Sequence, residues 1–139
     1  MSDNVYDTDV LIIGAGLAGI GSACHLRRND PNTNFIILES RAASGGTWDL
    51  FKYPGIRSDS DMYTYAYGFK PWKSKVSIAG GDKILSYIRD TAKEYDLDKH
   101  IRFQHKVVKA EWSSERKFWS VSIMRGDTGK TVIINCQFI

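Results

Sequence analysis

A glycine-rich turn between two structured segments constrains the fold of this chain more than any other feature. The run DVLII at residues 9–13 is apolar and largely β-branched, as in a strand buried on both faces of a parallel sheet. GAGLAG follows at once, and residues 17–28 then show a helical period that ends in two arginines, where cations suit the helix dipole. A second apolar strand, FIIL, is predicted at residues 35–38. This order predicts a βαβ unit over residues 8–40, with a right-handed crossover and parallel neighbouring strands.

The remainder of the chain predicts a loop, a helix and a β-meander. Residues 41–81 have no sustained helical period, but aromatic residues alternate from Tyr63 to Phe69, as in a half-buried strand or an extended arm. Residues 82–96 predict an amphipathic helix. Turn signals then separate strand-like runs, and an antiparallel meander is expected over 101–139; the runs are 101–112, 118–124 and 130–139.

Composition excludes several classes of function. A length of 139 residues suits one domain or part of one, and the 19 basic residues are spread along the chain, so the net charge of +3 does not indicate nucleic acid. Lysines and Trp72 beside the tyrosines could bind single-stranded nucleic acid, but Asp59 and Asp61 in the same segment carry negative charge and disfavour this. The histidines have no carboxylate or cysteine at ligand spacing, so no metal or catalytic triad is expected.

The cellular context expected from the sequence is the cytoplasm. The start, MSDNVYDTD, is acidic and lacks the basic residues of a signal peptide, and the longest apolar run is too short to span a bilayer. Cys24 and Cys136 lie in apolar segments and are expected to be buried free thiols, as in a reducing compartment.

GAGLAG has the GxGxxG spacing of a dinucleotide-binding turn. Gly14 permits the tight turn, Gly16 lets the backbone approach a pyrophosphate, and Gly19 lets the helix pack closely on the strand. Glycines alone would also suit a turn without a ligand. Glu39, however, ends the next strand twenty residues after Gly19, where a carboxylate can bind an adenosine ribose. A carboxylate there disfavours NADP, although Arg41 leaves this open, and the spacing does not distinguish NAD from FAD.

The segment SGGTWDLFKYPGIRSDSD, residues 44–61, distinguishes FAD from NAD as the expected cofactor. With GAGLAG and Glu39 before it, the GGTW at residues 45–48 resembles the extended FAD-binding pattern of glutathione-reductase-like flavoproteins. KYPGIRSDSDMYTYAYGF narrows the resemblance to the class B flavoprotein monooxygenases, which include flavin-containing and Baeyer–Villiger monooxygenases. The resemblance covers residues 9–72 and continues more loosely to the end. It implies an α/β fold, a Rossmann-like FAD-binding domain of the glutathione-reductase type, here incomplete, with the β-meander attached.

The resemblance also implies a role for individual residues. Those expected to line the pyrophosphate are Gly14, Ala15, Gly16, Ala18 and Gly19. Glu39 would bind the ribose, and Ser40 and Arg41 would lie near the adenine. Those expected along the FAD towards the flavin are Gly46, Thr47 and Trp48, with Tyr65 on the flavin side. Asp59 matches an aspartate beside the flavin and nicotinamide, and Val107 matches a position that contacts adenine through its backbone.

Arg57 and Asp59 are the candidate catalytic residues. Pro54 and Gly55 suit a fixed turn that would aim them, and a charged pair can tune the electron distribution at the redox edge of a flavin. The alternative is an ordinary ion pair on a loop. For the tyrosines, core packing is an equal alternative to contact with the cofactor.

The family's chemistry implies a larger protein than this chain. In it NADPH reduces FAD, oxygen adds to the reduced flavin, and the peroxyflavin inserts oxygen into a ketone or oxygenates nitrogen or sulfur of a small organic substrate. The second Rossmann domain for NADPH, the Baeyer–Villiger fingerprint and an arginine near the flavin are absent from these residues. Because VIINCQFI ends without a polar tail, we expect an N-terminal portion that is inactive alone. The alternative is a stand-alone dinucleotide-binding or interaction module that dimerises through its incomplete sheet.

Overall fold

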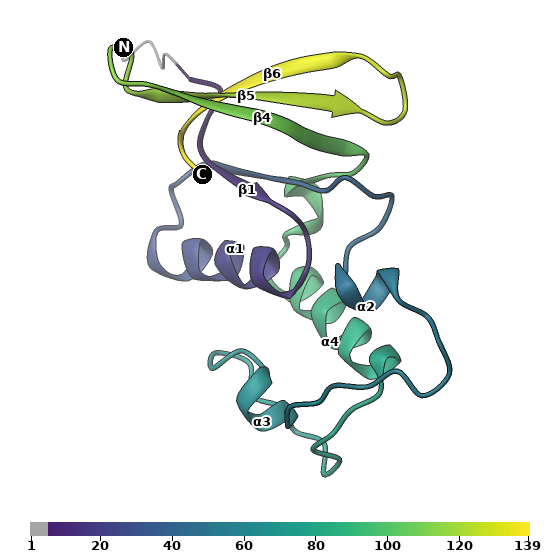
Figure 1. Cartoon of the computed structure of the whole chain (residues 1–139). Helices are drawn as coiled ribbons and strands as arrows, with labels where there is room; N and C mark the ends of the chain where they lie inside the picture. Colours follow the sequence, from purple (N-terminus) through teal and green to yellow (C-terminus); the bar gives the residue numbers. More distant parts are fainter. Residues whose placement is uncertain (1–5) are drawn as a thin grey trace.

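The computed structural model describes residues 6–139, in which helices pack against one six-stranded sheet (Figure 1). The N-terminal segment MSDNVYDTD, in which no signal peptide is expected, begins with residues 1–5, and these lie outside the described range. The helices are α1 Leu17–Asn29, α2 Thr47–Leu50, α3 Met62–Tyr65 and α4 Gly81–Glu94, with a 3-10 turn at Asp98–His100. The strands are β1 Thr8–Ile13, β2 Phe35–Leu38, β3 Ile101–Arg102, β4 His105–Ser113, β5 Phe118–Arg125 and β6 Thr131–Phe138.

The sheet joins a parallel half to an antiparallel half in the order β3-β2-β1-β6-β5-β4. β1 is parallel to β2, with Val10 opposite Phe35, and also parallel to β6, with Thr8 opposite Cys136. β4, β5 and β6 are antiparallel neighbours. The predicted βαβ unit and the predicted meander are therefore both present, and the α/β fold class is confirmed.

The two faces of β1 are buried against different layers, which explains its continuous apolar sequence. Ile12 belongs to the core on the side of α1 and α4, together with Ile20 and Ile88. Leu11 belongs to the second core, where it meets Val121 and other side chains of the meander. Figure 1 shows the helices on one side of β1 and the yellow-green meander on the other. The turn after β1 is thereby fixed between two packed layers.

The aromatic run from Tyr63 to Phe69 is a short helix and an irregular segment, so its prediction as a strand or extended arm was wrong. The Asp61 carboxylate accepts hydrogen bonds from the Thr64 N–H at 2.9 Å and from its hydroxyl, which caps α3. This local N-cap overrides the period-two alternation of the aromatic residues. Tyr67 and Phe69 then stack on each other, with ring centroids 4.9 Å apart.

The predicted strand at residues 101–112 is divided into two strands with different neighbours. β3 pairs with β2, whereas β4 pairs with β5 on the opposite edge of the sheet. Between them, Gln104 has a φ of 55°, a left-handed conformation in which no strand can continue. The sequence of this segment, IRFQHKVVKAEW, contains no glycine, proline, asparagine or aspartate that would have indicated the break.

Both cysteines are free and buried, as expected. Burial raises the pKa of the Cys24 thiol to about 11 from an ordinary 9.0. The pKa of Cys136 is also raised by burial, to about 11. Both thiols consequently remain protonated even at moderately alkaline pH.

We expect both cysteines to resist a thiol reagent such as 5,5′-dithiobis(2-nitrobenzoate) at pH 8. A pKa raised by about two units lowers the thiolate fraction roughly a hundredfold, and burial blocks access. The unfolded chain ionises its thiols at lower pH than the folded chain, so the free energy of unfolding should fall as pH rises from about 9 to 11. Labelling rates with and without urea, and urea titrations at pH 8 and 10.5, check this. Rapid labelling of the folded chain would contradict it.

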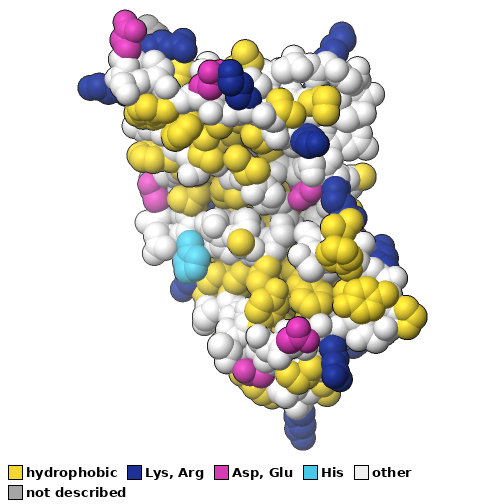
Figure 2. Space-filling view, viewed as in Figure 1, with side chains coloured by type: hydrophobic (Ala, Val, Ile, Leu, Met, Phe, Trp, Pro, Cys, Tyr) yellow, Lys and Arg dark blue, Asp and Glu magenta, His cyan; other side chains and the backbone are white. Residues whose placement is uncertain are grey.

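Apolar side chains reach the surface over the sheet and over the loop region around α2 and α3 (Figure 2). The exposed large apolar residues of the loop region are Leu50, Phe51, Tyr53, Tyr63, Val76 and Ile78. Among residues 6–139, no helix is long and apolar enough to cross a membrane.

Candidate functional site

The turn between β1 and α1 presents an open helix N-terminus. Gly14 has a φ of 99°, which an L side chain rarely adopts, and its N–H donates to the Leu38 carbonyl at 2.7 Å. Gly16 is the N-cap of α1, no side chain caps this end, and the first turn holds no acidic residue. The first N–H groups of a helix have no partner within the helix, so this end of α1 can bind an anion.

Gly19 lies where α1 crosses the turn, and no larger residue fits there. A Cβ on Gly19 would lie 1.9 Å from the Gly14 carbonyl oxygen and 3.4 Å from Ile12 Cγ2. The first and third glycines of the motif thus have the turn-forming and packing roles expected from their spacing.

A second glycine turn packs directly against the first. Gly45 and Gly46 have φ angles of 122° and 54°, and the Gly45 N–H donates to the Ala15 carbonyl at 2.9 Å. A Cβ on Gly46 would lie 3.0 Å from Gly16 Cα. The two turns, about thirty residues apart in the sequence, therefore approach each other through their backbones.

The two turns border one hollow, open to solvent, with a volume of about 410 Å³. It gathers most of the residues predicted to follow a dinucleotide from its phosphates to its second ring. The lining residues are Ile13, Gly14, Gly16, Leu17, Ala18, Gly19, Gly45, Gly46, Thr47, Trp48 and Tyr65. Of these, Ile13, Leu17 and Gly45 were not among the predicted site residues; Gly45 was marked by the glycine pair, whereas the other two are ordinary apolar positions.

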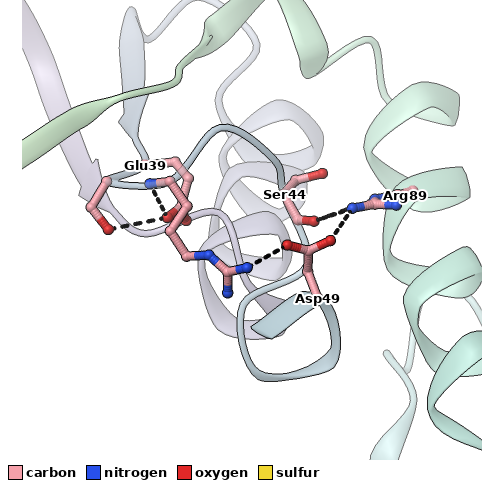
Figure 3. Close-up of polar contacts among 6 residues, drawn as sticks. Glu39, Ser44, Asp49 and Arg89 are labelled. Carbon is pink, nitrogen blue, oxygen red and sulfur yellow. Dashed lines mark hydrogen bonds and ion pairs between the residues drawn. The ribbon is translucent and has the colours of Figure 1, made fainter. Parts of the chain in front are cut away.

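Glu39 is buried, and Figure 3 shows its bonds to the two residues that follow it, while its other oxygen is directed at the first turn. Its Oε2 accepts the Ala15 N–H at 2.9 Å, and its Oε1 accepts the Arg41 N–H at 3.0 Å and the Ser40 hydroxyl at 3.3 Å. Ala15 is fully buried, so its N–H is held by Glu39 and not by the hollow. A carboxylate oxygen has capacity for more than one hydrogen bond, so Glu39 can still accept from a ribose hydroxyl.

Trp48 and Tyr65 meet on the far side of the hollow. The Trp48 indole N–H donates to the Tyr65 hydroxyl at 3.2 Å, and the two rings meet edge to face at 6.3 Å. Tyr67 supports the opposite wall, because its hydroxyl donates to the Leu17 carbonyl at 2.5 Å. Burial raises the pKa of Tyr67, so this hydroxyl remains a donor at neutral pH. Of the tyrosines in this run, Tyr65 lines the hollow, Tyr67 packs on the core without lining it, and Tyr63 is exposed.

Arg57, Asp59 and Val107 lie outside the lining of the hollow. Arg57 and Asp59 are exposed, and the described residues show no ion pair between them, so the alternative of a loop ion pair is not found. Arg57 forms a backbone bridge with Gly80. Val107 is half-buried in β4 and packs on the second core. No three potential metal ligands gather within residues 6–139.

An ion network behind the second turn was not anticipated from the sequence. The buried carboxylate of Asp49 pairs with Arg41 and with Arg89 of α4, each at 2.7 Å (Figure 3). Arg41 is the residue predicted near the adenine, and its guanidinium contacts the Asp49 carboxylate. Asp49 and Arg89 are forty residues apart, so no local pattern in the sequence indicates their pairing.

Comparison with known proteins identifies a domain family and relatives that resemble this chain. Residues 12–74 match a family model described as a NAD(P)-binding Rossmann-like domain. The FAD-containing monooxygenase EthA of Mycobacterium tuberculosis is 48% identical over 131 residues, 94% of this chain and 26% of the relative. The probable FAD-binding monooxygenase AlmA of Acinetobacter baylyi is 50% identical over 115 residues, 83% of this chain and 23% of the relative.

Solved structures of monooxygenases contain a region with the same fold. The crystal structure of OTEMO in complex with FAD and NADP matches with a TM-score of 0.80 and 28% identity, over 94% of this chain and 24% of that chain. An oxidized steroid monooxygenase bound to NADP matches with a TM-score of 0.79 and 30% identity, over 93% and 24%. The chain spans about a quarter of the length of these relatives. By sequence and fold, this chain corresponds to one portion of a class B flavoprotein monooxygenase.

Proposed function

We propose that the chain binds FAD, with the adenosine diphosphate at the turn between β1 and α1 and the flavin half beyond Gly46. The observation that carries this is the hollow formed where the Gly45–Gly46 turn meets Gly16. Its uncapped helix N-terminus suits a pyrophosphate, and its backbone walls leave room for a flat, extended ligand. The relatives named for FAD align with 94% and 83% of this chain.

Individual residues then have separate tasks. Amides at the start of α1, from Gly16 to Gly19, bind the pyrophosphate, while Gly14 and Ala15 shape the turn. Glu39 accepts the ribose hydroxyls and, through Ala15, fixes the turn. Thr47, Trp48 and Tyr65 line the way to the flavin. Ser40 and Val107 flank the adenine, and Arg57 and Asp59, exposed on their loop, face the reactive edge.

We further propose that a protein carrying this chain within the full length of its relatives is an NADPH-dependent monooxygenase. FAD supplies the redox chemistry that activates oxygen, and the substrate is a small organic ketone or a nitrogen or sulfur compound. The residues of this chain bind and orient the cofactor and exclude water from it. The cytoplasm, a reducing compartment compatible with two free cysteines, is the proposed location.

Ligand-dependent stability tests FAD binding directly. At free FAD a hundredfold above Kd, the free energy of unfolding should rise by about 2.7 kcal/mol. ADP should compete with FAD because it occupies the same phosphate site, whereas FMN, which lacks adenosine, should not. NADP⁺ should bind more weakly than NAD⁺, because the Glu39 carboxylate repels a 2′-phosphate. Urea titrations with each ligand measure these differences, and an unchanged midpoint with FAD would refute the proposal.

The alternative, a stand-alone interaction module, predicts a different outcome of the same experiment. Such a chain would not respond to FAD and would form a dimer, which size-exclusion chromatography with light scattering detects. β6 is paired on both sides, so a dimer through the sheet would have to use the edge strands β3 or β4.

A further inference from the structure

Asp49 is a buried carboxylate held between two arginines from different parts of the chain. Its side chain is 10% exposed, its Oδ2 pairs with Arg41 Nη2, and its Oδ1 pairs with Arg89 Nη2, both at 2.7 Å (Figure 3). Both oxygens are thus engaged by cations. A buried carboxylate is unfavourable unless it is paired in this way, so the geometry of Asp49 depends on both arginines.

The network connects three segments around the second glycine turn. Arg41 follows β2 and Glu39, Asp49 lies on α2, and Arg89 lies on α4. Arg89 also donates to the Ser44 carbonyl, from Nη2 at 2.8 Å and from Nε at 3.3 Å. Helix α4 therefore holds the turn at both ends, through Ser44 before it and Asp49 after it.

Asp49 reaches the hollow only through the backbone of the turn. Its N–H donates to the Gly46 carbonyl at 3.1 Å, and the Gly45 N–H donates to the Ala15 carbonyl at 2.9 Å. Gly46 in turn lies against Gly16. The Asp49 side chain does not line the hollow. A movement of Asp49 would therefore shift the wall formed by Gly45 and Gly46 without removing any contact to the ligand.

Arg41 shows that the network is maintained at some cost. Its Nη1 is buried with no hydrogen-bond partner among the described residues, while Nη2 is engaged by Asp49. Leaving a buried donor unpaired is unfavourable, and such groups are rare in folded proteins. The guanidinium is held at Asp49 despite this, so Asp49 determines its position. Its charge is thereby directed to Asp49.

We propose that Asp49 is a positioning residue for the flavin half of the bound dinucleotide, acting through the Gly45–Gly46 turn. The inference depends on the proposed binding of FAD. ADP ends at the phosphates held by the first turn, whereas FAD continues past the second. Misplacing the second turn should therefore weaken the binding of FAD more than the binding of ADP. The ratio of the two Kd values then reports whether the turn has moved.

The test compares Asp49→Asn with the wild-type chain by equilibrium dialysis against FAD and against ADP. We expect Kd for FAD to rise about tenfold and Kd for ADP to rise less than threefold, since small displacements of a binding wall have effects of this size. A mere loss of folded chain raises both Kd values by the same factor and leaves their ratio unchanged. Asp90→Asn is the matched control, because Asp90 is exposed on α4 next to Arg89 and should change neither Kd.

The outcomes separate this inference from the proposed function. If wild-type chain binds neither ligand, the proposed function fails and this inference fails with it. If wild-type chain binds FAD but Asp49→Asn leaves the ratio of Kd values unchanged, only the positioning role is overturned. If Asp49→Asn does not fold, Arg89→Gln replaces it, because Arg89 is 42% exposed and its removal keeps the Arg41–Asp49 pair. An unchanged ratio in Arg89→Gln would then overturn the role.

Discussion

Gly19→Ala should abolish FAD binding and destabilise the chain by about 3 kcal/mol or more. Alanine normally stabilises a helix by about 1 kcal/mol relative to glycine, so the local propensity of α1 favours the change. The steric effect is larger, because the new Cβ would lie 1.9 Å from the Gly14 carbonyl oxygen. Backbone cannot move aside as a flexible side chain can. Helix α1 must separate from the turn, and its N-terminus then no longer points into the hollow.

Urea denaturation and FAD titration measure the two effects of Gly19→Ala. Gly68→Ala is its control, because no atom lies within 4 Å of a Cβ at Gly68 and its φ is not in the left-handed region. Gly68→Ala should change neither property beyond about 0.5 kcal/mol. Normal stability and FAD affinity in Gly19→Ala would show that α1 does not pack on the turn as described.

Glu39→Gln should lower the free energy of unfolding by about 2 kcal/mol, the cost of one unsatisfied buried donor. The carboxylate accepts two backbone N–H groups, of Ala15 and Arg41, one on each oxygen. The glutamine amide keeps one acceptor oxygen and has an NH2 group in place of the other. One of the two backbone N–H groups therefore faces a donor and loses its acceptor. We expect FAD affinity to fall at least about tenfold, since the same group is proposed to accept the ribose hydroxyls.

The same pair of measurements applied to Glu115→Gln provides the control. Glu115 lies exposed in the turn between β4 and β5, and its replacement should have no effect on binding. If Glu39→Gln destabilises the apo chain but leaves the Kd for FAD unchanged, then Glu39 supports the turn and does not touch the ribose. Such a result would limit the proposed role to the Ala15 contact.

The parts of the fold that the sequence predicted are those with strong local patterns. The apolar run at residues 9–13, the glycines after it and the amphipathic helix near residue 84 each determine their structure through neighbours in the sequence. GxGxxG spacing and the following carboxylate brought Gly14, Gly16, Gly19 and Glu39 to one place. These contacts follow from the geometry of a βαβ unit, so spacing alone was sufficient to anticipate them.

The features that the sequence did not predict depend on contacts between distant segments or on a local competition. Asp61 caps α3 and prevails over the alternation of aromatic residues, because one hydrogen-bonded cap decides the conformation of a short segment. Asp49 and Arg89 are forty residues apart, and nothing in either neighbourhood indicates the other. The ion pair of Arg41 with Asp49 was likewise not predicted, because the sequence does not show which carboxylate a guanidinium will meet.

The pairing of β1 with β6 has a consequence for how the domain is made. Thr8 lies opposite Cys136, so β1, which is made before β6, must wait for this last strand of the meander before its hydrogen bonds on that side can form. Contacts between residues so distant in the chain slow folding, because the intervening segment must first be ordered. We expect the βαβ unit to remain an open, exchange-prone intermediate during synthesis. Its full protection from hydrogen exchange should then appear only when β6 joins the sheet.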